Sequence, residues 1–165
     1  MTRICKAGLS GAVAGMVWLG LSLSDSAYAE QLGEPRTVVE TFLAAVNEGD
    51  MAKVRSLLAD DYQVLRRGAG CPQTSDPVQC ELAWIESQWV KDNAQLKTID
   101  LRSEREVVRV SLAVSGDSIR ASGADRILLT KEFIVENGRI QSMLPTLHND
   151  DPQTAEYRKS TTAFR

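Results

Sequence analysis

The hydrophobic pattern of the chain changes its period near Gln95, and this change limits the folds that the sequence can adopt. Before Gln95, apolar residues recur every three or four positions, as on one face of an α-helix. After Gln95 they alternate with polar residues, as in strands that bury one face. Helices therefore come first and strands follow, without an internal repeat. This order is typical of a single α+β domain.

Three helices are expected before the change of period. The first begins at Pro35 and ends at Gly49 in "NEGD", Asp50 caps a second and shorter helix, and the third runs from Pro77 to about Asp92. The third helix carries an apolar stripe with steps of four, three and four residues. The stripe consists of Val78, Leu82, Ile85 and Trp89, and Trp84 lies beside it. The stretch "DDYQVLRR", between the second and third helices, predicts a short strand.

Four strands are expected after the change of period, and Asn137-Gly138 predicts a tight hairpin between the last two. The segment "EVVRVSLAVS" alternates regularly, with Val108, Val110, Leu112 and Val114 on one face. The strand "ADRILLTKEFIVE" has apolar residues on both faces, so its orientation stays open. The predicted fold is a one-domain α+β chain with a curved antiparallel sheet.

Residues 1–29 have the three parts of a secretory signal peptide: a short basic start, an uncharged apolar stretch and a small-x-small site at Ala27-Tyr28-Ala29. The alternative is a membrane anchor, because the apolar stretch approaches the shortest length of a span. The cleavage site directly after that stretch favours removal. Cys5 precedes the apolar stretch, which argues against a lipid anchor. We therefore expect a periplasmic or secreted protein without membrane attachment after cleavage.

Removal of residues 1–29 leaves 136 of the 165 residues. Asp25, Arg3 and Lys6 leave with this segment, so the 22 acidic and 19 basic residues become 21 and 17. A mildly acidic chain without a basic cluster is a poor candidate for binding nucleic acid or anionic lipid. No metal or nucleotide motif appears, so no cofactor is expected. We expect one domain over residues 30–148, followed by a polar C-terminal tail over residues 149–165.

Two cysteines, Cys71 and Cys80, remain after residue 29, in "CPQTSDPVQC". A zinc site needs more ligands than this pair and the single histidine, His148, can supply. A thioredoxin-type centre needs its cysteines two residues apart. An exported chain therefore favours a structural Cys71–Cys80 disulfide, worth roughly 2–3 kcal/mol in the chain-entropy model. Asp76 and Pro77 place Cys80 in the first turn of the third helix.

The segments "VVETFLAAVNEGDMAKVRSLLADDYQV" and "EFIVENGRIQSM" resemble the nuclear transport factor 2-like superfamily, which includes SnoaL-like polyketide cyclases and ketosteroid isomerases. The resemblance extends over Pro35 to Leu147. It implies a cone in which a bent sheet wraps three helices and an apolar pocket opens at one end. Members of the superfamily often dimerise through the outer face of the sheet, so a homodimer is a possible assembly. Because the fold hosts enzymes and binding domains alike, it does not specify an activity.

The resemblance allows the catalytic positions of ketosteroid isomerases to be compared with the residues of this chain. The three catalytic positions of ketosteroid isomerases correspond here to Phe42, Arg66 and Thr130. Phe42 has no hydroxyl to polarise a carbonyl, and the guanidinium of Arg66 cannot act as a general base near neutral pH. The sequence therefore assigns no catalytic residue.

The pocket implied by the resemblance has eight candidate ligand-binding residues: Phe42, Tyr62, Arg66, Trp84, Val110, Leu112, Thr130 and Glu132. If Thr130 faces inward, alternation also brings Leu128, Glu132 and Ile134 inward. Arg66 then pairs with Glu132 or binds an acidic ligand; the alternative is that both charges reach solvent. Outside this set, His148 is a candidate acid or base, or an exposed loop residue. Asp60 and Asp61 are a paired-acid site or solvated residues at the end of a helix.

Three functions remain compatible with these residues. The first is an exported domain that binds a small apolar or amphipathic molecule without catalysis. The second is a cyclase, hydrolase or isomerase with an unusual catalytic set, drawn from Arg66, Glu132, Tyr62 and His148. The third is an interaction module, which an apolar outer sheet face would favour. The residues that would form this apolar face are Ile127, Leu129, Phe133 and Val135.

Overall fold

The structure, a computed structural model, describes residues 34–65 and 76–162. The predicted signal peptide, Arg66 and Cys71 lie outside these ranges. The elements follow in the order α2 (Pro35–Glu48), α3 (Met51–Leu57), β1 (Leu58–Val64), α4 (Pro77–Ile85), the π-helical turn η1 (Glu86–Val90), β2 (Gln95–Glu104), β3 (Val107–Ser115), α5 (Asp117–Ala121), β4 (Ile127–Glu136), β5 (Arg139–Leu147) and α6 (Pro152–Thr162). The predicted α+β class, with helices before strands, is confirmed. Neither α5 nor α6 was expected.

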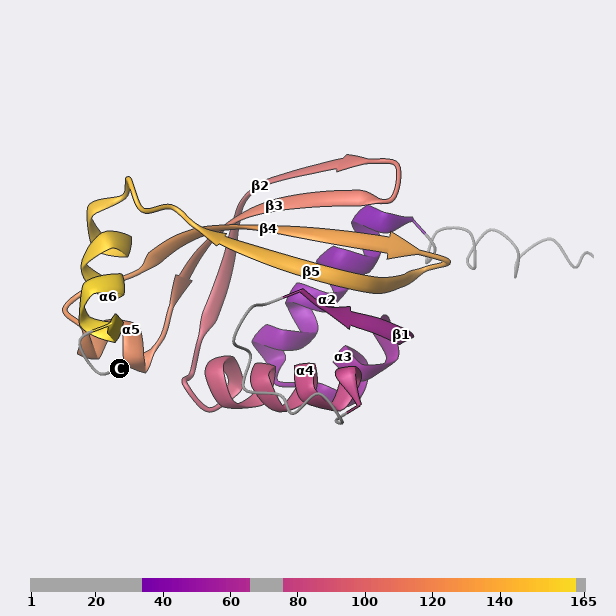
Figure 1. Ribbon diagram of the computed structural model, residues 1–165, viewed down its shortest axis with the longest axis horizontal. Coiled ribbons are helices and arrows are strands. Elements are labelled where there is room, and N and C mark those ends of the chain that lie inside the picture. Colours follow the sequence, from indigo (N-terminus) through magenta and orange to yellow (C-terminus); the bar gives the residue numbers. More distant parts are fainter. Residues whose placement is uncertain (1–33, 66–75, 163–165) are drawn as a thin grey trace, which may run out of the picture.

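The five strands form one sheet in the order β1-β5-β4-β3-β2. Strands β2 to β5 pair antiparallel, as predicted, but β1 pairs parallel with β5, so the sheet is mixed. The pairing shifts register between Thr98 and Asp100 in β2 and between Ile134 and Val135 in β4. Such irregularities bend strands. Figure 1 shows the result: the sheet curves over α2, α3 and α4, and β3 and β4 bend down toward α5.

Helix α2 provides the apolar surface on which the sheet closes. Pro35 starts it, and Gly49 ends it with a left-handed φ of 71°, which glycine adopts without strain. Phe42, fully buried, meets the ring of Phe133 on β4 with centroids 5.7 Å apart and an interplanar angle of 69°. The side chain of Asn47 donates to the Leu96 carbonyl at 2.9 Å and accepts from the Leu96 amide at 2.8 Å. These contacts fix the helix to both the middle and the edge of the sheet.

The alternation of β4 decides which of its side chains can reach the interior. Its buried side chains are Ile127, Leu129, Lys131, Phe133 and Val135. The expectation that Thr130 and Glu132 line a pocket is therefore wrong, because both lie on the opposite face of the strand. Glu132 pairs there with Arg109 of β3 at 2.7 Å, and the Thr130 hydroxyl lies 2.8 Å from Nε2 of His148. The apolar outer face considered from the sequence is also wrong, since its four residues belong to the buried set.

The expected tail contains helix α6, and hydrogen bonds attach it to the start of β4. Asp151 caps the helix: its side chain accepts from the Thr154 amide at 2.9 Å and from the Thr154 hydroxyl at 2.8 Å. The same hydroxyl oxygen accepts from the Leu128 amide at 2.8 Å, and Thr154 is fully buried. The Gln153 side chain accepts from the amides of Asp125 and Arg126 at 3.0 and 3.1 Å. A side-chain network thus holds the helix against the sheet.

Thr154→Val tests this network. Valine keeps the shape of threonine but cannot accept from the buried Leu128 amide, so we expect the free energy of unfolding to fall by about 1–3 kcal/mol. Chemical denaturation followed by circular dichroism measures the change. Thr161→Val on the exposed side of the same helix is the control, with an expected change of under about 0.5 kcal/mol. Equal losses in the two variants would contradict the role of Thr154.

The cap also predicts a pH dependence. The Thr154 amide and hydroxyl, and then the nearby Arg126, lower the pKa of the Asp151 carboxyl below its ordinary 3.8. A carboxyl whose pKa is lower in the folded state stabilises the fold at pH values above its pKa in the unfolded state. This stabilisation is lost as the pH falls through the pKa of the folded state. The stability difference between the wild type and Asp151→Asn should therefore narrow from about pH 6 to about pH 3. Thermal unfolding at each pH measures it, and a constant difference would show that the Asp151 charge has no stabilising role.

Candidate functional site

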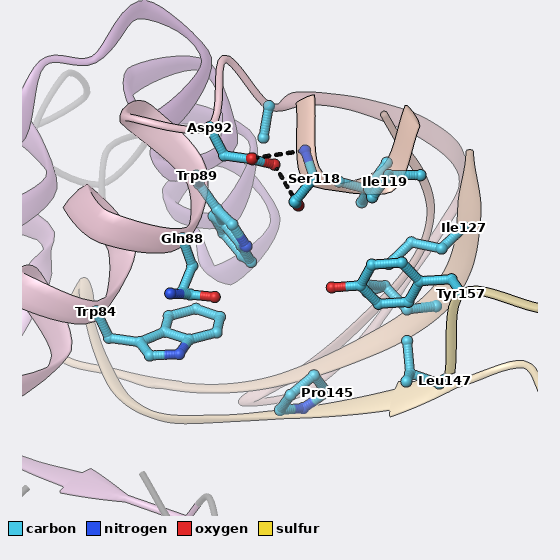
Figure 2. A pocket seen from close by; sticks show the side chains of 13 residues that line it. Trp84, Gln88, Trp89, Asp92, Ser118, Ile119, Ile127, Pro145, Leu147 and Tyr157 are labelled. Carbon is cyan, nitrogen blue, oxygen red and sulfur yellow. Dashed lines mark hydrogen bonds between the residues drawn. The ribbon is translucent and has the colours of Figure 1, made fainter. Parts of the chain in front are cut away.

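A cavity of about 300 Å³ opens at the end of the domain where α5 and α6 lie, between η1 and the concave face of the sheet. Figure 2 shows its two sides: Trp84, Gln88 and Trp89 come from α4 and η1, and Tyr157 of α6 lies opposite them. Aliphatic side chains form much of the remaining wall. They are Val114, Ile119, Ile127, Leu129 and Leu147. The cavity is therefore mostly apolar and has aromatic rings on both sides.

The π turn positions the tryptophan wall. In η1 the Lys91 amide bonds to the Glu86 carbonyl, five residues earlier, at 2.9 Å. Such a turn is wider than an α-helical one, and residues five apart come close to the same face. Trp89 consequently packs against Trp84, with ring centroids 5.2 Å apart and an interplanar angle of 65°. The buried residues Val78, Ile85 and Trp89 confirm the stripe predicted for this helix.

Asp92 is the acidic residue of the cavity wall. Its carboxylate accepts from the Ser118 amide and from the Ser118 hydroxyl, both at 2.8 Å. Its backbone carbonyl accepts from the Asp117 amide at 2.9 Å. A Cβ atom at Gly116 would collide with this carboxylate, so the glycine leaves the space that Asp92 occupies. The end of η1 and the start of α5 thus fix the carboxylate in one orientation.

Tyr157 extends its hydroxyl into the cavity from α6 (Figure 2). Burial raises the pKa of this hydroxyl above its ordinary 10.0, and the negative charge of Asp92 raises it further, while Ser118 acts in the opposite direction. A phenol with a raised pKa stays protonated at neutral pH. It therefore offers a ligand a hydrogen-bond donor and an acceptor, but not a phenolate base.

Lys131 lies behind the tryptophan wall, in the interior of the domain. Its side chain is 1% exposed, and its ammonium nitrogen lies 3.8 Å from the centroid of the Trp89 ring. The rings of Phe42, Trp84 and Phe133 surround the same nitrogen, each with its centroid 5.7–5.8 Å away. Electron-rich ring faces attract a cation at these distances. Lys131 is not among the candidate residues from the sequence, because an inward Thr130 and Glu132 would put Lys131 on the other face of the strand.

The structure separates the other residues expected in the pocket. Trp84 lines this cavity, whereas Phe42, Tyr62, Val110 and Leu112 are buried in the packed core. His148 lies beside Thr130, on the face of the sheet away from the core. Asp60 pairs with Arg55 at 3.2 Å and with Arg139 at 3.1 Å and is exposed, as expected of a solvated residue. These placements give no proton-transfer set among the expected residues that the structure describes.

Asp92, Ser118 and Tyr157 are not among the candidate residues from the sequence. A signal for the helix that carries Tyr157 was present, because Asp151-Pro152 repeats the Asp-Pro start used by Asp76-Pro77. In the described ranges 34–65 and 76–162, His, Cys, Asp and Glu side chains nowhere gather in threes suited to a metal ion. Within the same ranges no helix has the length and apolar character needed to cross a membrane.

No family profile matches the sequence, and comparison with curated protein sequences also finds no match. Solved structures do match. IdmH from Streptomyces antibioticus, a proposed polyketide cyclase, aligns with a TM-score of 0.59 and 18% identity, over 74% of this chain and 96% of its own. An LEH-like epoxide hydrolase from M. tuberculosis aligns with a TM-score of 0.55 and 16% identity, over 79% and 93%.

A nuclear transport factor 2-like protein of unknown function from Cytophaga hutchinsonii aligns with a TM-score of 0.52 and 13% identity, over 70% of this chain and 91% of its own. Identities this low establish the fold and leave activity open. These structural matches agree with the resemblance carried by "VNEGD" and "VENGRI". The chain has the fold of the nuclear transport factor 2-like superfamily.

Proposed function

We propose that the protein is an exported domain that binds a small, mainly apolar molecule in the cavity between η1 and α6. The observation that carries the proposal is the pairing of a preformed cavity with aromatic and aliphatic walls and a few polar groups at one end. A volume of about 300 Å³ lies at the lower end of the range of small-molecule sites. Apolar surface that a ligand buries there contributes roughly 25 cal/mol per Å² before the costs of binding.

Catalysis has less support than binding. The nearest polar groups are the Asp92 carboxylate, which two Ser118 contacts hold, and the protonated Tyr157 hydroxyl. These groups orient a ligand by hydrogen bonds and a negative charge. Gln88 and Ser118 add polar contacts that require no proton transfer.

Binding can be tested by tryptophan fluorescence. The chain has three tryptophans, and Trp18→Phe leaves only Trp84 and Trp89, both of which line the cavity. We expect 1-adamantanol, a compact neutral probe without near-ultraviolet absorption, to change this emission saturably. Ile127→Phe, which adds bulk inside the cavity, should weaken binding by roughly tenfold.

Ile134→Phe is the matched control, because it makes the same change on the opposite face of β4. This variant should bind 1-adamantanol as tightly as the Trp18→Phe protein without a substitution in β4. An emission that does not respond to adamantanol, or equal effects of the two phenylalanine substitutions, would overturn the proposal. Native mass spectrometry of the purified protein adds a direct search for a co-purifying small molecule.

Export and the Cys71–Cys80 disulfide form the second part of the proposal. Both rest on the sequence of residues 1–29 and on the spacing of the two cysteines. We expect the full chain, expressed in a secreting bacterial host, to lose residues 1–29 and two hydrogen atoms. Intact mass before and after reduction measures both changes, with a Cys71→Ser, Cys80→Ser variant as the control. An unprocessed chain would contradict export, and free thiols in a processed chain would contradict the disulfide.

A further inference from the structure

We propose that the cavity selects amines: apolar molecules that carry one positive charge, with the ammonium group placed between Asp92 and Tyr157. This inference rests on the proposed function and adds the chemical class of the ligand. Asp92 is the one charged side chain among the thirteen described residues that line the cavity; none of the thirteen is Lys, Arg or His. An apolar space with a single carboxylate is complementary to a monocation.

The Asp92 carboxylate retains acceptor capacity for such a ligand. An ionised carboxylate has about four lone-pair positions, and Ser118 uses one on each oxygen. These bonds, together with the space at Gly116, hold the carboxylate at the cavity wall without neutralising it. An ammonium group can donate to a free position and to the Tyr157 oxygen. A ligand carboxylate would instead meet the negative charge of Asp92.

Aromatic rings support the same assignment. Trp84, Trp89 and Tyr157 face the cavity from two sides (Figure 2), and their electron-rich faces attract cations. Lys131 of the protein itself places an ammonium nitrogen 3.8 Å from the centroid of the Trp89 ring. The tilt of 65° between the two indoles gives a ligand two differently oriented ring surfaces.

Asp92 also gives the ligand a direction. Figure 2 shows Asp92 and Pro145 at different ends of the cavity. A cationic head turns toward Asp92, and the apolar body then contacts Ile127, Leu129 and Leu147.

A matched series of probes tests this assignment on the full chain with Trp18→Phe. The series consists of 1-adamantylamine, 1-adamantanol and 1-adamantanecarboxylate, which share one apolar body and differ in charge. We expect the amine to bind roughly tenfold more tightly than the alcohol, and the carboxylate most weakly. Asp92→Asn should remove the advantage of the amine and leave the affinity for the alcohol within about twofold.

Asp61→Asn is the control variant, since it removes the same charge from an exposed position on β1, at the other end of the domain. It should keep the preference for the amine. Alcohol or carboxylate binding as tight as amine binding in the wild type overturns the amine assignment while leaving the proposed function intact. Failure of all three probes overturns the proposed function as well. The wild-type series decides the matter even if Asp92→Asn does not fold.

Discussion

The contact between Lys131 and its aromatic neighbours organises the interior of this domain. A buried ammonium loses its hydration, and this loss is costly unless other groups stabilise the charge. Four rings lie close to the nitrogen, and Trp89 is the nearest at 3.8 Å. Two of these rings come from η1 and the end of α4, one from α2 and one from β4. The same cluster therefore joins three separate parts of the chain and supports the wall of the cavity.

The cavity exists because the sheet and the helices diverge at one end. Near β1, the core is filled by residues such as Phe42, Tyr62 and Leu112. Toward α5, β3 and β4 bend away, and the π turn carries Trp89 into the widening space. The helices α5 and α6 then close the opening incompletely. The cavity thus follows from curvature in the sheet combined with one extra residue per turn in a helix.

The sequence predicted the elements whose pattern is local and strong. The helix from Pro35, the stripe from Val78 to Trp89 and the Asn137-Gly138 hairpin all appear where expected. Strand β4 was harder, because each of its faces carries both apolar and charged residues. Its concave face includes Lys131 and its convex face includes Leu128 and Ile134, so neither face is purely apolar or purely polar. In the fold, aromatic rings from distant parts of the chain lie around the one charged residue of the concave face.

Other parts could not be predicted from periodicity. The parallel pairing of β1 with β5 joins segments about eighty residues apart, and no short sequence motif predicts this pairing. Helix α6 has little amphipathic character, so its apolar pattern gave no signal, although its Asp-Pro start did. Asp92 has an ordinary sequence context; only the fold brings it to Ser118 and Tyr157.

Different residues of helix α6 contact the start of β4 and the cavity. Asp151, Gln153 and Thr154 attach its first turn to the sheet, whereas Tyr157, which borders the cavity, comes from the following turn. The part of the cavity wall that Tyr157 forms thus comes from a helix that follows the last strand of the sheet. A substitution at Tyr157 therefore alters the cavity wall without replacing a residue of the sheet. The strands supply the aliphatic wall of the cavity, and α6 supplies the ring that lies opposite the two tryptophans.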